Sequence, residues 1–287
     1  MKPIMVADYA CATGEGPLWH PDEGRVYWVD IPAGRMFRYD PATGHHEPCY
    51  QGPSVGGFTL QADGKLLLFM AQGAIRVWRD GFYETIVAEI PDERESRFND
   101  VIADPEGRVF CGTMPTRERP GRLYRLDPDG SLRVVVPEVG ISNGMGFTPD
   151  LTGMYYTDTR ARAIYLYDYD RGTGEIANRR VFASVPNEPG EGGPDGMTVD
   201  AEGYVWSARW DGGCLVRYDP AGNIVGRIGF PAKKVSCPSF GGPDYADLYV
   251  TTAGGQNKAV EGEGAGALFR VDAGVRGVPE FRSRIGL

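Results

Sequence analysis

Histidine and cysteine are both scarce in this chain of 287 residues. The three histidines are His20, His45 and His46, and the last two are adjacent in a turn-like segment. A histidine-based catalytic triad or a histidine-rich zinc site therefore has almost no raw material in this chain. The five cysteines are odd in number, widely spaced and without a C-x-x-C pair. This pattern argues against a disulfide framework and predicts a cytoplasmic protein with free thiols.

Long apolar runs and clusters of basic residues are also missing. No run approaches the roughly 18 apolar residues that a membrane span requires, and the N-terminal segment lacks the apolar core of a secretory signal. The 30 basic and 39 acidic residues give a net charge of −9. An acidic chain without a Lys/Arg cluster is a poor partner for nucleic acid or an anionic membrane, so we expect neither.

Helical periodicity is nearly absent, and a repeated pair of short strands takes its place. Gly (41 residues) and Pro (22 residues) interrupt the chain between segments rich in β-branched and aromatic residues, as in strands. The first strands of successive pairs are expected to begin at Arg25, Lys65, Arg108, Met154, Tyr204 and Leu248. A period that drifts between about 40 and 50 residues, with several strands per unit, is typical of propeller blades.

Six such units fill residues 1–287 and predict an all-β, six-bladed β-propeller that forms a single domain. The segment "MVADYA" at 5–10 precedes the first unit, and we expect it to add an outer strand to the sixth blade. The alternative is a β-sandwich whose hairpins are similar by coincidence.

Polar residues recur at one position of this repeat, six residues before the turn that follows each innermost strand. The six residues at that position are Glu15, Gly56, Asn99, Asn143, Asp195 and Cys237. Equivalent positions of all blades lie on one ring around a propeller axis, so we expect the polar members to converge at one mouth of the channel. The alternative is ordinary turn chemistry, since Asn-Gly and Asp-Gly are strong turn formers.

Two carboxylates and two amide oxygens would make an all-oxygen ligand set. Such a set suits Ca²⁺, Mg²⁺ or Mn²⁺ better than thiolate-seeking metals. Four protein oxygens are fewer than Ca²⁺ usually takes, so water or substrate would complete the coordination. We therefore predict a metal site at one mouth of the channel, catalytic or purely structural.

Five ordered blocks of the sequence resemble the gluconolactonase / regucalcin / luciferin-regenerating enzyme family of six-bladed propellers. They are "GEGPLW" (14–19), "RFNDVIADPEGRVFCGTM" (97–114), "SNGMGFTPD" (142–150), "PDGMTVDAEGYVWSARW" (194–210) and "CPSFGGPDYADLYVTT" (237–252). The resemblance covers nearly the whole chain and keeps the order of the family blocks.

The resemblance implies specific roles for the matching residues. One divalent cation is expected on Glu15, Asn143 and Asp195, with Ca²⁺ first and Zn²⁺, Mg²⁺, Mn²⁺ or Fe²⁺ as alternatives. Arg97 and Asn99 are expected to face the substrate. Their neighbour Asp100 is expected to orient Asn99 or to cap a strand end.

Glu118, in the variable loop "PTRERPG" at 115–121, corresponds to a further substrate contact, or else belongs to a solvated charged loop. Asp195 is our candidate for the general base that activates water.

The predicted function is metal-dependent hydrolysis of sugar lactones to aldonic acids, by a monomer or weak homo-oligomer. A hydrolase of phosphotriesters or aryl esters on the same metal site is one alternative. A non-catalytic calcium-binding propeller is the other, although binding a metal alone requires neither Arg97 nor Asn99.

Overall fold

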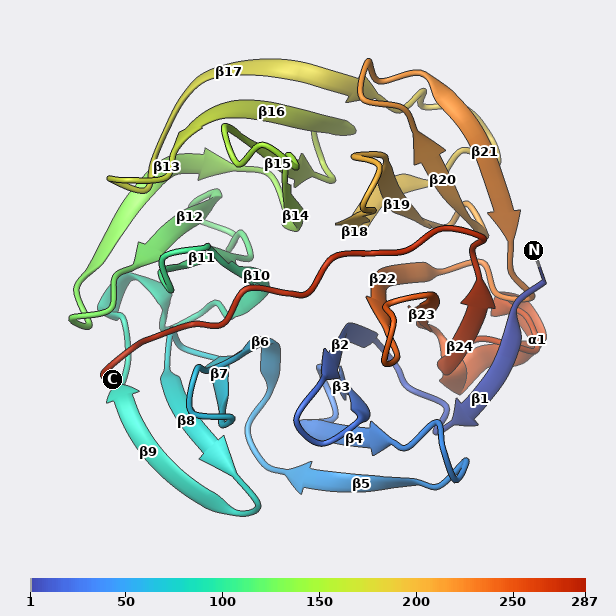
Figure 1. Ribbon diagram of the computed structural model, residues 1–287, viewed down its shortest axis with the longest axis horizontal. Helices are drawn as coiled ribbons and strands as arrows, with labels where there is room; N and C mark the ends of the chain where they lie inside the picture. Colours follow the sequence, from blue (N-terminus) through green and yellow to red (C-terminus); the bar gives the residue numbers. More distant parts are fainter. Residues whose placement is uncertain (1) are drawn as a thin grey trace.

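The computed structural model describes residues 2–287, and its strands form six separate four-stranded sheets. Figure 1 shows these sheets arranged as blades around a central channel. Neighbouring strands within each blade are antiparallel and follow one another in sequence, except where the sixth blade closes the ring. The predicted six-bladed β-propeller is therefore confirmed.

The two strands closest to the channel form the most buried part of each blade. The innermost strands are β2 (Gly14–His20), β6 (Val55–Leu60), β10 (Phe98–Ala103), β14 (Ser142–Phe147), β18 (Gly193–Val199) and β22 (Val235–Gly241). The second strands are β3 (Arg25–Asp30), β7 (Leu66–Met70), β11 (Val109–Thr113), β15 (Gly153–Asp158), β19 (Val205–Trp210) and β23 (Asp247–Thr252). Each second strand begins within one residue of its predicted start.

The outer half of each blade is increasingly exposed. The third strands are β4 (Arg35–Tyr39), β8 (Ile75–Arg79), β12 (Gly121–Leu126), β16 (Ala163–Asp170), β20 (Cys214–Tyr218) and β24 (Ala267–Asp272). The outermost strands are β1 (Ile4–Asp8), β5 (His46–Gln51), β9 (Phe82–Val87), β13 (Leu132–Val139), β17 (Glu175–Ser184) and β21 (Ile224–Gly229). All of β14 is buried, whereas most of β17 is exposed, so the core lies near the channel and between adjacent blades.

The N-terminal strand closes the ring, as the sequence predicted. β1 pairs with β24 and supplies the outer strand of the sixth blade. The three short helices are η1 (Pro91–Glu93), η2 (Gly255–Asn257) and α1 (Lys258–Glu261). Among residues 2–287, no helix has the length and apolar character that crossing a membrane requires. The five cysteines are free, also as predicted.

The direction of the six innermost strands gives the channel two different mouths. We call the mouth at their N-terminal ends the site mouth, because the candidate residues lie there. At their C-terminal ends, residues 273–287 cross the channel as an extended segment, drawn in red in Figure 1. We call this segment the strap and the mouth that it crosses the strap mouth.

Candidate active site at one mouth of the channel

Every innermost strand has a β-bulge close to its N-terminal end. The register shifts fall between Glu15 and Leu18, Val55 and Gly57, Phe98 and Val101, Asn143 and Met145, Pro194 and Met197, and Val235 and Cys237. Glu15 and Asn143 immediately precede a bulge, whereas Asn99 and Asp195 lie within one. Bulges redirect side chains, so this repeated irregularity aims residues from four blades toward the channel.

The interpretation of Asn143-Gly144 and Asp195-Gly196 as turns is wrong, because both pairs lie inside strands. Their glycines serve close packing of the innermost strands. A Cβ on Gly144 would lie 2.7 Å from the Asp195 carbonyl oxygen, and one on Gly196 would lie 2.5 Å from the sulfur of Cys237. A larger residue at either position would therefore push neighbouring blades apart where the site is formed.

Three carboxyl groups influence one another at the site mouth, where Glu15 and Asp195 are buried and Asp100 is half-buried. Burial raises the pKa of Glu15 well above its ordinary range, and the charges of Asp195 and Asp100 add to that rise. Burial and then the charge of Asp100 raise the pKa of Asp195 in the same way. Burial also raises the pKa of Asp100 to about 7. Because each rise reflects the cost of a desolvated negative charge, the site mouth favours a bound positive charge.

Two oxygens of the expected ligand set are buried without a hydrogen-bond partner among residues 2–287, namely Asn143 Oδ1 and Asp195 Oδ2. The amide Nδ2 of Asn143 donates to Thr159 Oγ1 at 3.0 Å, and that hydroxyl donates to the Pro194 carbonyl at 2.7 Å. These bonds hold the amide so that Oδ1 is left free. An unpaired buried acceptor costs free energy, and a cation would satisfy both oxygens at once.

Histidine, cysteine and carboxylate side chains alone do not complete a metal site here. Within the described residues, no three of them group closely enough to hold an ion. The expected set therefore depends on the amide oxygen of Asn143 beside the carboxylates of Glu15 and Asp195. An all-oxygen set of this kind fits a hard divalent cation.

The half-buried Arg97 side chain lies beside the carboxylates. Its Nη1 donates to Asn99 Oδ1 at 2.7 Å and to the Phe98 carbonyl at 2.9 Å. Asn99 Nδ2 donates to the Ser142 carbonyl at 2.8 Å, so both ends of this amide are engaged. Burial lowers the pKa of Arg97, while the charges of Glu15, Asp100 and Asp195 oppose the change.

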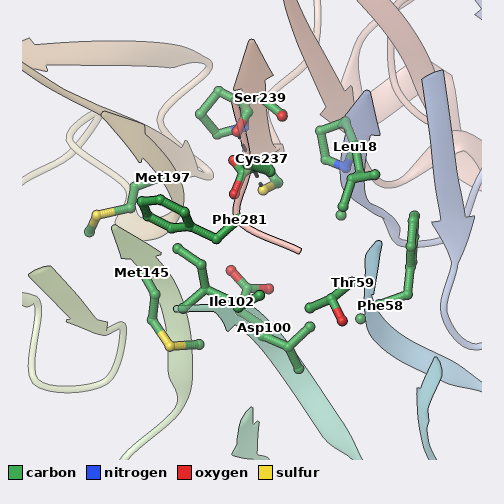
Figure 2. Close-up of a pocket in the computed structure, with 17 residues that line it drawn as sticks. Leu18, Phe58, Thr59, Asp100, Ile102, Met145, Met197, Cys237, Ser239 and Phe281 are labelled. Atoms are coloured by element: carbon green, nitrogen blue, oxygen red, sulfur yellow. Dashed lines mark hydrogen bonds between the residues drawn. The ribbon is translucent and has the colours of Figure 1, made fainter. Parts of the chain in front are cut away.

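The structure corrects the expectation for Asp100. The partners of the Asn99 amide are Arg97 and Ser142, so Asp100 does not orient it. Asp100 instead lines a cavity of about 70 Å³ in the channel below the site, where Figure 2 shows its carboxylate. Neighbouring residues of a bulged strand point in different directions, which separates Asp100 from Asn99.

Glu118 is the one expected site residue that is exposed and has no contact with the others. It is exposed, and its side chain makes no hydrogen bond or ion pair within residues 2–287. Its backbone N–H donates to Thr116 Oγ1 at 3.2 Å. Its contact with substrate stays a prediction.

Sequence reasoning missed Thr159 and Ser142, which hold Asn143 and Asn99 in their orientations. The signal available was weak. Ser142 precedes Asn143 in the "SNG" block, and Thr159 ends the "TDT" segment at 157–159. A hydroxyl or a carbonyl that acts through a neighbour has no sequence pattern of its own.

Comparison with known proteins gives a consistent picture. Residues 13–254 match the model of the family described as "SMP-30/Gluconolactonase/LRE-like region". The chain is 51% identical to "Pentonolactonase XacC" of Haloferax volcanii, over all of both chains. It is 34% identical to "Putative sugar lactone lactonase YvrE" of Bacillus subtilis, over 94% of each chain. A solved structure of a calcium-binding protein, regucalcin, from Agrobacterium tumefaciens has a TM-score of 0.90 at 27% identity, covering 98% of this chain and 97% of its own.

Proposed function

The chain belongs to the SMP-30/gluconolactonase/LRE-like family, and from this premise we propose that it is a lactonase that hydrolyses sugar lactones to aldonic acids. The names of the relatives in Haloferax volcanii and Bacillus subtilis support this reaction class. The former, a pentonolactonase, also suggests five-carbon lactones as the first substrates to test. We further propose that the whole chain works as one propeller unit.

The observation that carries the proposal is the pair of unpartnered oxygens, Asn143 Oδ1 and Asp195 Oδ2, buried beside Glu15. These three residues would hold one divalent cation, with Ca²⁺ first because the Agrobacterium structure is named a calcium-binding protein. Zn²⁺, Mg²⁺, Mn²⁺ and Fe²⁺ are the alternatives. When bound, such a cation would polarise the lactone carbonyl and stabilise negative charge on its oxygen.

Asp195 is proposed as the general base that takes a proton from the attacking water and then returns it to the ring oxygen as the bond between that oxygen and the carbonyl carbon breaks. One of its carboxylate oxygens would be available for that proton while the other faces the cation. Burial and the charge of Asp100 raise its pKa, which strengthens it as a base, whereas a nearby cation would act in the opposite direction. A lactone is a reactive ester, so a base of intermediate strength would suffice.

Arg97 and Asn99 are proposed to orient the substrate. The remaining N–H groups of Arg97 can donate to the sugar hydroxyls, and the Arg97–Asn99 bond fixes the plane of the guanidinium. A bound sugar held in one orientation presents one face of its carbonyl to the attacking water. Glu118 would add a contact from the exposed loop.

The decisive experiment measures proton release on a panel of lactones after removal of metals with EDTA. The panel contains xylono- and arabinono-lactones beside glucono-, galactono- and fucono-lactones, and Ca²⁺, Mg²⁺, Mn²⁺, Zn²⁺ or Fe²⁺ is added back. The test variant is Glu15→Gln, and the matched control is Glu138→Gln on the exposed strand β13. We expect cation-restored turnover in the wild type and the control, with loss in Glu15→Gln.

The same assay, extended to phosphotriesters and aryl esters, decides between the alternatives. A folded wild type that binds a cation but opens none of these lactones would overturn the lactonase proposal. Turnover of phosphotriesters or aryl esters under those conditions would identify the other hydrolase, and no turnover at all would leave a calcium-binding propeller.

A further inference from the structure

The strap makes contacts with all six blades although it forms no regular strand. Its backbone hydrogen bonds join Ala201 N to Arg276 O, Gly277 N to Tyr245 O, Ser283 N to Leu60 O, Ala62 N to Ser283 O, Arg284 N to Gly107 O and Gly286 N to Pro128 O, at 2.8–2.9 Å. These bonds reach the second, third, fifth and sixth blades. The guanidinium of Arg282 donates two bonds of 2.7 Å to Asp22 of the first blade, and the ring of Phe281 lies 6.0 Å from that of Phe147 in the fourth.

Side chains reinforce these anchors in the second blade. The amide of Gln61 donates to the Ile285 carbonyl at 3.2 Å and accepts from the Ile285 N–H at 3.0 Å. Thr59 Oγ1 donates to Ser283 Oγ at 2.9 Å. Ser283 and Ile285 are both buried. The strap is therefore fixed in register on either side of the channel, and the residues between its anchors are held over the strap mouth.

Two residues between the anchors, Glu280 and Phe281, line the cavity in the channel. The Phe281 ring lies among Ile102, Met145 and Met197 in Figure 2, and these side chains line the cavity below the site. Met145 and Met197 are each two residues beyond a site residue on the same innermost strand, Asn143 on β14 and Asp195 on β18. The ring thus lines the same cavity as side chains from β14 and β18, two of the three strands that carry the expected ligands.

We propose that Phe281 of the strap closes the channel at the strap mouth, so that the channel is open only at the site mouth. The same side chain holds the innermost strands at the spacing that the site requires. The packing argument is direct. Protein interiors are dense, and a removed ring leaves a cavity that its surroundings fill only partly. Strands β14 and β18 would then lose their common support below Asn143 and Asp195.

The first test probes the seal and depends on neither a metal nor an activity. Cys237 lines the same cavity and is buried, so its labelling by N-ethylmaleimide, read by peptide mass spectrometry, reports on access to the chamber. In Phe281→Ala we expect labelling about tenfold faster than in the wild type, because solvent enters from the strap mouth. Phe281→Leu refills most of the space and should label at nearly the wild-type rate.

The matched control is Ile285→Ala, which shortens a buried strap side chain that does not line the cavity and keeps the backbone bonds of Ile285 to Gln61. It should lower the melting temperature about as much as Phe281→Ala and leave the labelling of Cys237 unchanged. Equal labelling rates in the wild type and all three variants, or equally faster labelling in both alanine variants, would contradict the proposal that Phe281 closes the channel. The strap would then only hold the blades together.

The second test measures Ca²⁺ affinity by isothermal titration calorimetry and rests on the proposed function. A misplaced ligand strand should weaken binding about tenfold in Phe281→Ala, with wild-type affinity in Ile285→Ala. Unchanged affinity in Phe281→Ala would overturn the positioning role. A wild type that binds no divalent cation would instead contradict the proposed metal site. The labelling experiment alone would then test whether Phe281 closes the channel.

Discussion

Asp195 and Asp200 lie five residues apart at opposite ends of β18, and both are buried, yet their surroundings differ completely. At the strap mouth, Asp200 accepts hydrogen bonds from the backbone N–H groups of Glu202 and Tyr204, from Trp206 Nε1 and from the Arg217 guanidinium. At the site mouth, Asp195 Oδ2 accepts none within residues 2–287. A buried acceptor without a partner destabilises the fold, so Asp200 is stabilised by its surroundings whereas Asp195 is left with an unpaired oxygen that a ligand could satisfy.

The same contrast separates the two amides at the mouths. Gln61 uses both ends of its amide to hold Ile285 of the strap, whereas Asn143 leaves its oxygen unpaired beside Asp195. Unsatisfied polar groups that persist in a well-packed protein tend to mark functional sites, where the loss is offset elsewhere in the fold.

The largest effect is expected for Asp195→Asn, which removes the proposed base. Lactone turnover should fall by about a thousandfold or more. Because the variant also removes a buried charge, the metal-free protein should unfold at a higher temperature than the wild type, by a few degrees. Turnover assays and calorimetry check the two outcomes. Lost activity together with lower stability would mean that Asp195 has a structural role instead.

Asp200→Asn should have the opposite effects to Asp195→Asn: it should lower the stability of the fold and leave the candidate active site intact. The substitution removes the carboxylate whose Oδ2 lies 2.7 Å from Arg217 Nη2. Breaking a buried ion pair of this kind costs about 3 kcal/mol of unfolding free energy. The fraction that stays folded should retain the wild-type Michaelis constant, since Asp200 lies at the far end of the strand. A protein destabilised by less than about 0.5 kcal/mol would show that this ion pair adds little.

The arrangement of the blades was predictable because it follows a repeated pattern. Alternating and aromatic-rich segments located the second strands, such as β3 at Arg25, within one residue. The convergence of Glu15, Asn143 and Asp195 followed from the same repeat. The bulges were not predictable, because an extra residue in a strand leaves the apolar pattern almost intact, and they decide that Asp100 faces the cavity while Asn99 faces Arg97.

The strap was not predictable for a different reason. Residues 273–287 contain glycine and proline, and they lack the periodicity of a strand or helix. Their contacts join groups that are far apart in the sequence, by 32 residues for Gly277 and Tyr245 and by 224 residues for Gln61 and Ile285. Long-range backbone hydrogen bonds depend on position in the fold and not on residue type, so a single sequence carries no sign of them.

Glu280 in the strap predicts how stability depends on pH. Burial raises the pKa of its carboxyl from the ordinary 4.5 to about 7, so the folded chain holds this proton more tightly than the unfolded chain. The contribution of Glu280 to stability is therefore favourable at low pH and is lost as the pH rises from about 4.5 through about 7. Glu280→Gln should raise the melting temperature by a few degrees at pH 8 and hardly change it at pH 4.

Melting curves of the wild type, Glu280→Gln and the surface control Glu138→Gln between pH 4 and pH 8 would test this point. The difference between Glu280→Gln and the wild type should grow with pH, while the control stays parallel to the wild type. A constant difference would show that Glu280 is hydrated and that the strap mouth is less closed than its contacts indicate.

The smallest expected effect is that of Thr159→Val, which keeps the shape of the side chain but removes the hydroxyl that accepts from Asn143 Nδ2 and donates to the Pro194 carbonyl. Asn143 would then be free to rotate, and kcat/KM should fall about tenfold, with little change in melting temperature.

Thr157→Val is the matched control. Its hydroxyl is buried on the same segment without a partner, so its loss should leave activity unchanged and stability unchanged or higher. Equal losses of activity in both variants would mean that packing near β15, and not the orientation of Asn143, limits the reaction.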